Sequence, residues 1–182
     1  MNISKKTKIM IGLISLFIIG AFLFMFGGNI FNKNDNNSGN KPKIDIDYTV
    51  VPSATAVTEE ITNGVKVEQS FVCPIDTISN VAVVFSKQYY VEDVKLLIEL
   101  LDGTKVLASR EYDVKDIPDQ HRTFLDPASP ISGMKNKELR LRISPVSKSD
   151  TGLAIMMNDT TGGVFMFDKR NVKGTLCFSV TE

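Results

Sequence analysis

The residues Ile9 to Phe26 (IMIGLISLFIIGAFLFMF) form an unbroken run without a charged, amide or imidazole side chain. Extended through Gly27 and Gly28, a helix of this run measures about 27 to 30 Å at about 1.5 Å per residue. That length matches the hydrocarbon core of a bilayer. A soluble helix that is apolar on every side needs a large core around it, and the remaining chain is too short to build one. The sequence therefore predicts a transmembrane helix over residues 9–28.

Two interpretations of this segment compete, a cleaved secretory signal and a retained anchor. A secretory signal usually has an apolar stretch of about 7 to 15 residues and a small-x-small cleavage site. The run in this chain is longer, and Ala21 is followed by bulky side chains. Because Lys5, Lys6 and Lys8 precede the run, the positive-inside tendency places residues 1–8 in the cytoplasm. We therefore expect a signal anchor that is retained in the cell membrane, with the rest of the chain outside.

The next stretch, residues 29–43 (NIFNKNDNNSGNKPK), is rich in Asn and also contains Gly, Ser and Pro. Such a composition cannot pack a core and is typical of a flexible tether. The remaining residues, 44–182, have about the commonest size of a single domain. The expected order is a cytoplasmic N-terminus at 1–8, an anchor at 9–28, the tether, and one extracytoplasmic domain.

Alternation of apolar and polar residues, which marks half-buried strands, dominates the chain after the tether. Ile78–Phe85 and Val94–Leu101 are denser in apolar residues, as expected for central strands covered on both faces. Asp102-Gly103 predicts a tight hairpin between Val94–Leu101 and Lys105–Tyr112. With no convincing helical period after the anchor, these signals predict an all-β fold, an antiparallel β-sandwich of about eight to ten strands. The alternating segments are Ile44–Val50, Val65–Phe71, Leu139–Ile143 and Leu176–Val180.

The composition limits the classes of function. Lys and Arg together number 21, as do Asp and Glu, so there is no electrostatic case for a nucleic-acid partner. His121 is the single histidine, and no nucleophile elbow, phosphate-binding loop or Ser/His/Asp order is visible. Asp113, Asp116 and Asp119 recur at every third residue but lack the Gly and terminal Glu of a calcium loop. We therefore expect no enzyme, no cofactor and no metal site.

The two cysteines, Cys73 and Cys177, face a non-reducing compartment if the predicted topology holds. A disulfide between them would close a loop of about a hundred residues and stabilise the fold by about 4 to 5 kcal/mol in the chain-entropy model. Cys73 shares the parity of the inward residues of its strand, whereas Cys177 is opposite in parity to Leu176 and Phe178 and is expected to point outward. The sequence leaves two alternatives open, a disulfide or two unpaired thiols.

Several segments, taken in order, resemble a bacterial jelly-roll module. They are Ile61–Phe71 (ITNGVKVEQSF), Ile78–Phe85 (ISNVAVVF) and Val94–Gly103 with its Asp-Gly hairpin, followed by the irregular stretch and strand of Phe124–Ile143. The resemblance covers roughly residues 61–180. It implies an extracytoplasmic jelly roll similar to carbohydrate-binding modules and galactose-binding-like domains, which are often attached to membrane proteins of surface-polysaccharide pathways.

In such a sandwich, Phe71 is expected in the core and Gln69 near a sheet edge. Many members of the class bind sugars through exposed aromatic side chains, and this chain has no Trp. Tyr89 and Tyr90, between two apolar strands, are expected on a loop at one end of the sandwich. An exposed Tyr pair offers flat faces that stack on a pyranose and hydroxyls that hydrogen-bond to it. The alternative is that one Tyr covers the core and the other is an isolated surface residue.

A second polar group consists of Arg110, Glu111, Tyr112, His121, Arg122 and Asp126. If the segments that carry them lie side by side, their charged groups can hydrogen-bond sugar hydroxyls. The alternative is a set of solvated cross-strand pairs, each worth a few tenths of a kcal/mol.

Two functions therefore remain as hypotheses. The first is a membrane-anchored, non-catalytic interaction subunit that docks on another cell-envelope protein. The alternative is a carbohydrate-binding module that engages cell-envelope polysaccharide. Both hypotheses include the anchor and the tether. The position of the two groups of candidate residues in the fold distinguishes one hypothesis from the other.

Overall fold

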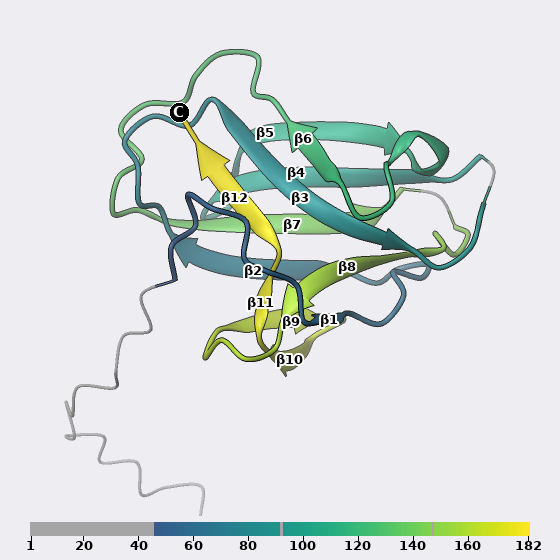
Figure 1. The fold of residues 1–182 in the computed structure, drawn as a ribbon. Helices are drawn as coiled ribbons and strands as arrows, with labels where there is room; N and C mark the ends of the chain where they lie inside the picture. Colours follow the sequence, from purple (N-terminus) through teal and green to yellow (C-terminus); the bar gives the residue numbers. More distant parts are fainter. Residues whose placement is uncertain (1–45, 92, 147) are drawn as a thin grey trace, which may run out of the picture. The chain divides into compact units, whose positions relative to one another are not determined.

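The computed structural model describes residues 46–91, 93–146 and 148–182, which belong to one compact unit, Ile44–Glu182. This part of the chain is a sandwich of two antiparallel sheets (Figure 1), so the prediction of an all-β antiparallel sandwich is confirmed. Its one helix is the short 3-10 helix η1 (Val114–Asp116), and no helix among the described residues is long and apolar enough to cross a membrane. The predicted anchor and tether lie outside the described residues.

One layer is a sheet made of β2 (Val67–Val72), β4 (Lys95–Asp102), β5 (Lys105–Asp113), β7 (Glu138–Pro145), β9 (Val164–Phe167) and β10 (Arg170–Lys173). This β2 sheet has the strand order β10–β9–β2–β7–β4–β5. One of its faces packs on the core and the other faces solvent, which explains the alternation in the sequence. In β7, Leu139 and Leu141 are buried in the core, whereas Arg140 and Arg142 lie on the opposite, outer face.

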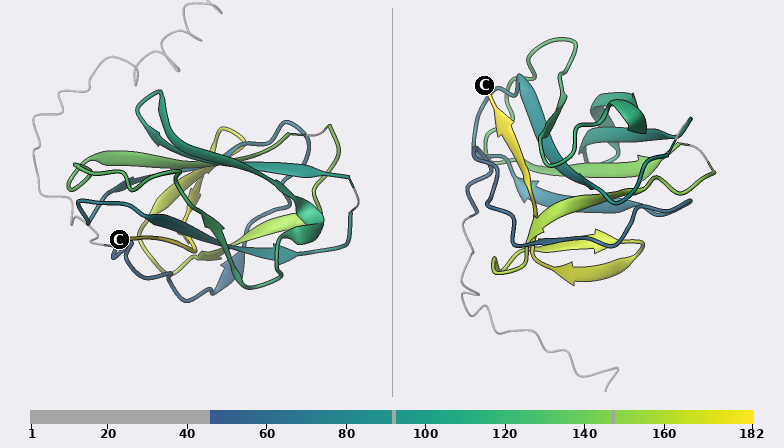
Figure 2. Two further views of the ribbon diagram at one scale, coloured as in Figure 1. Left: turned by 90° about the horizontal axis from the view of Figure 1, so that it is seen from above. Right: turned by 45° about the vertical axis from the view of Figure 1, so that its right-hand side comes forward.

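The other layer, the β3 sheet, consists of β1 (Ala56–Val57), β3 (Asn80–Lys87), β6 (Arg122–Leu125), β8 (Leu153–Asn158), β11 (Thr175–Leu176) and β12 (Phe178–Thr181). The strand β3 is its centre and pairs with β6, β8 and β12. Figure 2 shows the two sheets as separate layers when the sandwich is seen from above.

The dense apolar segments are central strands, as predicted. Six consecutive residues of β3 are buried, and β4 lies between β7 and β5 with most of its side chains covered. The predicted hairpin between β4 and β5 is also confirmed, with Asp102 opposite Lys105 and Gly103 at a φ of +58°. A register shift between Leu100 and Leu101 marks a bulge in this hairpin.

One expectation about an individual segment needs correction. The described part of Ile44–Val50 is a turn and not a strand, although Tyr48 is buried and its carbonyl accepts a 2.8 Å hydrogen bond from the Val180 amide. Gln69, expected near a sheet edge, lies one residue past the last β2–β9 pair, and its side chain is buried at 1% exposure. The strand β8 was not predicted, because its sequence LAIMMN is mostly buried and shows no alternation.

An aromatic cluster lies in the core between the two sheets. The ring centroids of Tyr48, Phe71 and Phe178 are 4.9 to 5.2 Å apart, within the range of favourable tilted and edge-to-face contacts. The expected core position of Phe71 is thus confirmed. Beside the cluster, the Gln69 side chain donates to the Tyr48 hydroxyl at 3.1 Å and accepts from the Leu176 amide at 2.7 Å.

Candidate functional site

Tyr89 and Tyr90 lie in the loop between β3 and β4, at one end of the sandwich, as predicted. Their side chains are both exposed, Tyr89 at 49% and Tyr90 at 65%. Neither ring therefore belongs to the core. Tyr90 is the most exposed large hydrophobic residue of the described chain, and its hydroxyl has no hydrogen-bond partner there.

The Tyr89 side chain is fixed by Glu60. Its hydroxyl donates a 2.5 Å hydrogen bond to Glu60 Oε1, and the Gly152 amide donates to the same oxygen at 2.9 Å. The hydrogen bond to this carboxylate raises the pKa of Tyr89 to about 12, because ionisation would remove the donated proton. Gly152 has a φ of +64°, and a Cβ atom there would lie 2.6 Å from the Tyr89 carbonyl oxygen. The β3–β4 loop, the β7–β8 loop and the segment before β2 thus meet at this point, and position 152 has no room for a side chain.

Charged side chains of both signs lie in and beside these loops. Glu60 is partly buried at the contact with Tyr89, and Asp93 and Asp150 are exposed. Asp150 accepts a 3.3 Å hydrogen bond from the Asn63 amide and acts electrostatically on Tyr89. Lys148 is the exposed cation of the β7–β8 loop. Lys66 lies in the segment before β2, and Lys87 and Lys95 flank the β3–β4 loop, so charges of both signs lie at this end of the sandwich.

The second candidate group lies where the edge strand β5 meets β6. Arg110 and Asp126 form an ion pair at 3.9 Å, and the Arg110 guanidinium lies over the Tyr112 ring, 5.1 Å from its centroid. The Tyr112 hydroxyl donates a hydrogen bond to the Phe124 carbonyl, and burial raises its pKa. Asp126 also accepts a 2.6 Å hydrogen bond from Asn80 Nδ2. These contacts connect the edges of the two sheets and use most of the polar groups of the cluster.

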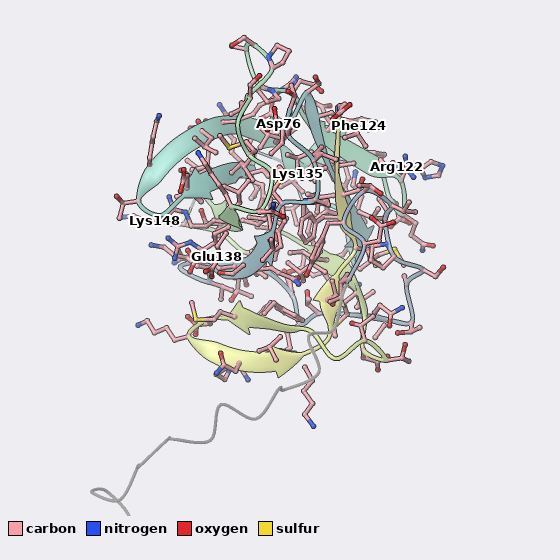
Figure 3. All side chains as sticks on the ribbon, turned by 90° about the vertical axis from the view of Figure 1, so that its left-hand side faces the viewer. Asp76, Arg122, Phe124, Lys135, Glu138 and Lys148 are labelled. Carbon is pink, nitrogen blue, oxygen red and sulfur yellow. The ribbon has the colours of Figure 1, made fainter. Side chains whose placement is uncertain are left out.

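His121 and Arg122 do not join that cluster through any hydrogen bond or ion pair within the described residues. The Nδ1 atom of His121 lies 2.8 Å from the Asp119 carbonyl oxygen, in the loop that leads into β6. Arg122 is exposed opposite Val84 in the β3–β6 ladder. Figure 3 shows Arg122 and Phe124 on one side of the sandwich and Lys148 on the other side.

Tyr89 and Asp126 are held at different ends of β3. Asn80, the first residue of β3, binds Asp126, whereas Tyr89 follows two residues after Lys87, the last residue of the strand. Seven residue steps along a strand correspond to about 23 Å. Tyr89 and Asp126 therefore do not converge on one site, and Arg122, opposite Val84, lies between them along the strand.

Both cysteines are buried free thiols. Of the two alternatives that the sequence left open, a disulfide or two unpaired thiols, the structure has the unpaired thiols. The Cys73 thiol donates a 3.3 Å hydrogen bond to the Ile75 carbonyl. Cys177 lies at the junction of β11 and β12, where its amide binds the Met156 carbonyl and its carbonyl binds the Val84 amide. It is outside the core cluster, as its parity indicated, but neighbouring residues cover it to 1% exposure. Burial raises the pKa of Cys177 to about 11.

An ion-pair ladder lies on the outer face of the β2 sheet, outside both groups of candidate residues. Arg142 lies between Glu68 and Glu99 on neighbouring strands, with a 2.6 Å hydrogen bond from its Nε to Glu99 and a 4.0 Å contact to Glu68. Arg140 reaches Glu68 at 3.5 Å and also donates to the Gly103 carbonyl. The alternation LRLRI was the available signal, because it places both arginines on one face. The charges of this ladder are paired with one another.

The described residues contain no group of three or more His, Cys, Asp or Glu side chains suited to hold a metal ion. Asp119, one of the three regularly spaced aspartates, instead accepts a hydrogen bond from the Lys87 amide at 2.8 Å. No family model matches the chain, and no curated protein matches its sequence.

Proposed function

We propose that the chain is a membrane-anchored interaction subunit whose non-catalytic β-sandwich docks on another protein of the cell envelope. The apolar run at residues 9–28 and the lysines before it supply the anchor and its orientation, with the N-terminus inside. The Asn-rich stretch at 29–43 supplies a tether, and the sandwich supplies the docking surface. The resemblance to extracytoplasmic jelly-roll modules attached to membrane proteins agrees with this arrangement.

One observation carries the choice of a protein partner over a sugar. Sugar recognition needs several unpaired polar groups that converge on one ligand. In this sandwich the polar groups of Arg110, Tyr112 and Asp126 bind one another or the adjacent backbone, and Tyr89 binds Glu60. Tyr89 and Asp126 also lie at different ends of β3. Recognition through side chains that are spread over a surface is the usual mode of protein–protein contacts.

A carbohydrate-binding module is the second candidate, and the exposure of Tyr90 favours it. At 65% exposure and without a hydrogen-bond partner in the described chain, Tyr90 presents a ring face and a free hydroxyl to solvent. Stacking on a pyranose needs such a ring. A module of this kind would engage cell-envelope polysaccharide from the same anchored position.

Cross-linking in intact membranes tests the proposal. The full chain is expected in the membrane fraction, resistant to extraction by high salt and released by detergent. A short-span lysine cross-linker is expected to join it to a second protein, with the same yield after enzymatic removal of envelope polysaccharide. Loss of the product on removal of polysaccharide would favour the carbohydrate-binding module instead. Release by high salt alone would contradict the anchor.

A further inference from the structure

The strand β5 forms an open edge of the β2 sheet. It pairs with β4 on one side, and no strand of the described chain pairs with its other side (Figure 1). With nine residues, Lys105–Asp113, it is the longest of the described strands, and it contains no proline. The strand at the opposite edge of the sheet, β10, has four residues. A long edge without proline is a template on which a further strand can pair.

The backbone of β5 presents unpaired polar groups at this edge. The Val114 amide donates a 2.9 Å hydrogen bond to the Val94 carbonyl, in line with the register of the β4–β5 ladder. Along an antiparallel ladder, residue pairs that exchange hydrogen bonds alternate with pairs that do not. The N–H and C=O groups of Ser109, Glu111 and Asp113 therefore point away from β4. Within the described residues these groups have no hydrogen-bond partner, and all three residues are exposed.

The charge pattern of β5 is complementary to itself. Its basic residues, Lys105 and Arg110, come first, and its acidic residues, Glu111 and Asp113, come last. An antiparallel second copy therefore sets the basic part of one strand beside the acidic part of the other. Charges of both signs flank the strand, so no excess of one sign repels a copy. They are Lys95, which lies 3.7 Å from Glu111, Asp126, which pairs with Arg110, Glu99 and Asp102, which pair with Arg142 and Lys137, and Lys115 and Asp116 in η1.

Among the registers that pair most of the strand, one brings no like charges face to face. When the Ser109 residues of two copies meet at a two-fold axis, and the bulge in each strand counts as one step, every charged residue faces an uncharged one. A centre on Arg110 sets two arginines against each other, and every centre from Glu111 onward sets acidic residues against acidic residues. A centre on Ala108 sets Arg110 against Lys105. Like charges directly opposite each other destabilise a strand pair.

We infer that β5 pairs antiparallel with β5 of a second copy of this chain, with the two Ser109 residues at the two-fold axis. The N–H and C=O groups of Ser109 then bond across the axis, and Lys105 of each copy faces Tyr112 of the other, beside Glu111 and Asp113. The two β2 sheets become one continuous sheet. Because the contact is isologous and uses both open edges, it closes as a dimer. This contact goes beyond the proposed function, since docking on another envelope protein neither requires nor excludes it.

Disulfide cross-linking of the full chain in its membrane tests the pairing and its register. Opposed residues of a hydrogen-bonded pair have Cα atoms about 5.5 Å apart, within the range of a disulfide. Ser109→Cys is therefore expected to give a disulfide-linked dimer under mild oxidation with copper phenanthroline. Glu111→Cys, also at the edge, is expected to give none, because its two copies are about 13 Å apart along the strands. The wild type, whose two cysteines are buried, and Ser70→Cys, on the outer face of β2, are also expected to give none.

A charge at the axis tests the same contact without cysteine. Ser109→Lys sets two ammonium groups against each other and is expected to reduce the protein mass of the full chain in detergent micelles from that of two chains to that of one. Ser109→Ala keeps the axis neutral and is expected to retain the mass of two chains. Light scattering measures these masses, and circular dichroism shows whether each variant is folded.

Three results would overturn the inference: the mass of one chain for the wild type, an unchanged mass in Ser109→Lys, or a disulfide-linked dimer from Glu111→Cys and none from Ser109→Cys. The proposed function is tested separately. A lysine cross-link to another protein, in membranes where Ser109→Cys gives no dimer, would overturn the β5 contact and still support docking on an envelope protein.

Discussion

The side-chain oxygen of Gln69 accepts a 2.7 Å hydrogen bond from the backbone amide of Leu176, and this bond joins the two sheets through the core. Gln69 belongs to β2 and Leu176 to β11, so the contact crosses from one layer to the other. The Gln69 amide group also donates to the Tyr48 hydroxyl, which connects the entering chain to the same point. A buried polar side chain thus fixes how three distant segments meet beside the aromatic cluster.

Replacement of Gln69 by Ala is expected to lower the free energy of unfolding by about 3 kcal/mol. The change leaves the Leu176 amide and the Tyr48 hydroxyl without a partner in the core and also creates a cavity. Gln69→Leu refills the volume and isolates the hydrogen-bond contribution. Ser70→Ala, on the exposed side of the same strand, is the matched control and is expected to change stability by less than about 0.5 kcal/mol. Urea denaturation of the described domain measures all three, and equal effects of Gln69→Ala and Ser70→Ala would contradict the role of this bond.

The role of Gln69 illustrates what the sequence could and could not predict. Period-two alternation reports only which face of a strand a residue occupies, and it placed Phe71 correctly in the core. It does not report which segment lies across the core, so the partner of Gln69 on β11 was not predictable. For the same reason the alternation predicts a strand at Tyr48, although its burial comes from packing on Phe71 and Phe178 within a turn.

The candidate residues show the same limit. An exposed loop position for Tyr89 and Tyr90 followed from their place between two apolar strands, because connections between buried strands run over the surface. That Tyr89 is bound to Glu60, in a separate segment of the chain, depends on the way the loops meet at the end of the sandwich. Single-sequence patterns contain no information on such pairings across the fold.

Two ion pairs on the outer face of the β2 sheet are expected to differ in their contribution to stability. Arg142 and Glu99 are largely covered, with 26% and 9% of their side chains exposed, and lie 2.6 Å apart in direct cross-strand register. Lys95 and Glu111 lie 3.7 Å apart with about half of each side chain exposed. Because solvent screens the exposed pair, we expect a coupling energy below about 0.5 kcal/mol for Lys95–Glu111 and about 1 to 2 kcal/mol for Arg142–Glu99.

Double-mutant cycles with Arg142→Met, Glu99→Gln, Lys95→Met and Glu111→Gln measure both couplings by urea denaturation. The covered pair is expected to lose little of its coupling at high salt, since water and ions reach it poorly. A larger coupling for the exposed pair would show that coverage does not control these energies.

Tyr89 is expected to remain protonated at a higher pH than an ordinary tyrosine. Its pKa is raised from 10.0 to about 12, chiefly because its hydroxyl donates a hydrogen bond to Glu60. The folded-state pKa is above the unfolded value, so the contribution to stability is complete below about pH 10 and is lost between about pH 10 and 12. The difference in absorbance at alkaline pH between the wild type and Tyr89→Phe gives the titration of this single residue. Glu60→Gln is expected to move that titration toward pH 10, and an unchanged midpoint would contradict the cause.

Cys73 and Cys177 are expected to resist thiol reagents in the folded protein and to react fully once it is unfolded. Both are buried free thiols, and burial raises the pKa of Cys73 and that of Cys177, the latter to about 11. Because the thiolate is the reactive species, little of either group is nucleophilic near pH 8. Labelling with a chromogenic disulfide reagent, without prior reduction, is expected to yield two thiols per chain in denaturant and almost none in its absence.

The raised pKa of Cys177 also predicts that its contribution to stability is lost as the pH rises from about 9 toward 11, since the unfolded chain ionises first. Cys177→Val removes this titration and keeps a buried apolar side chain. In the labelling experiment, a yield of no thiols in denaturant would reveal a disulfide in place of the free pair.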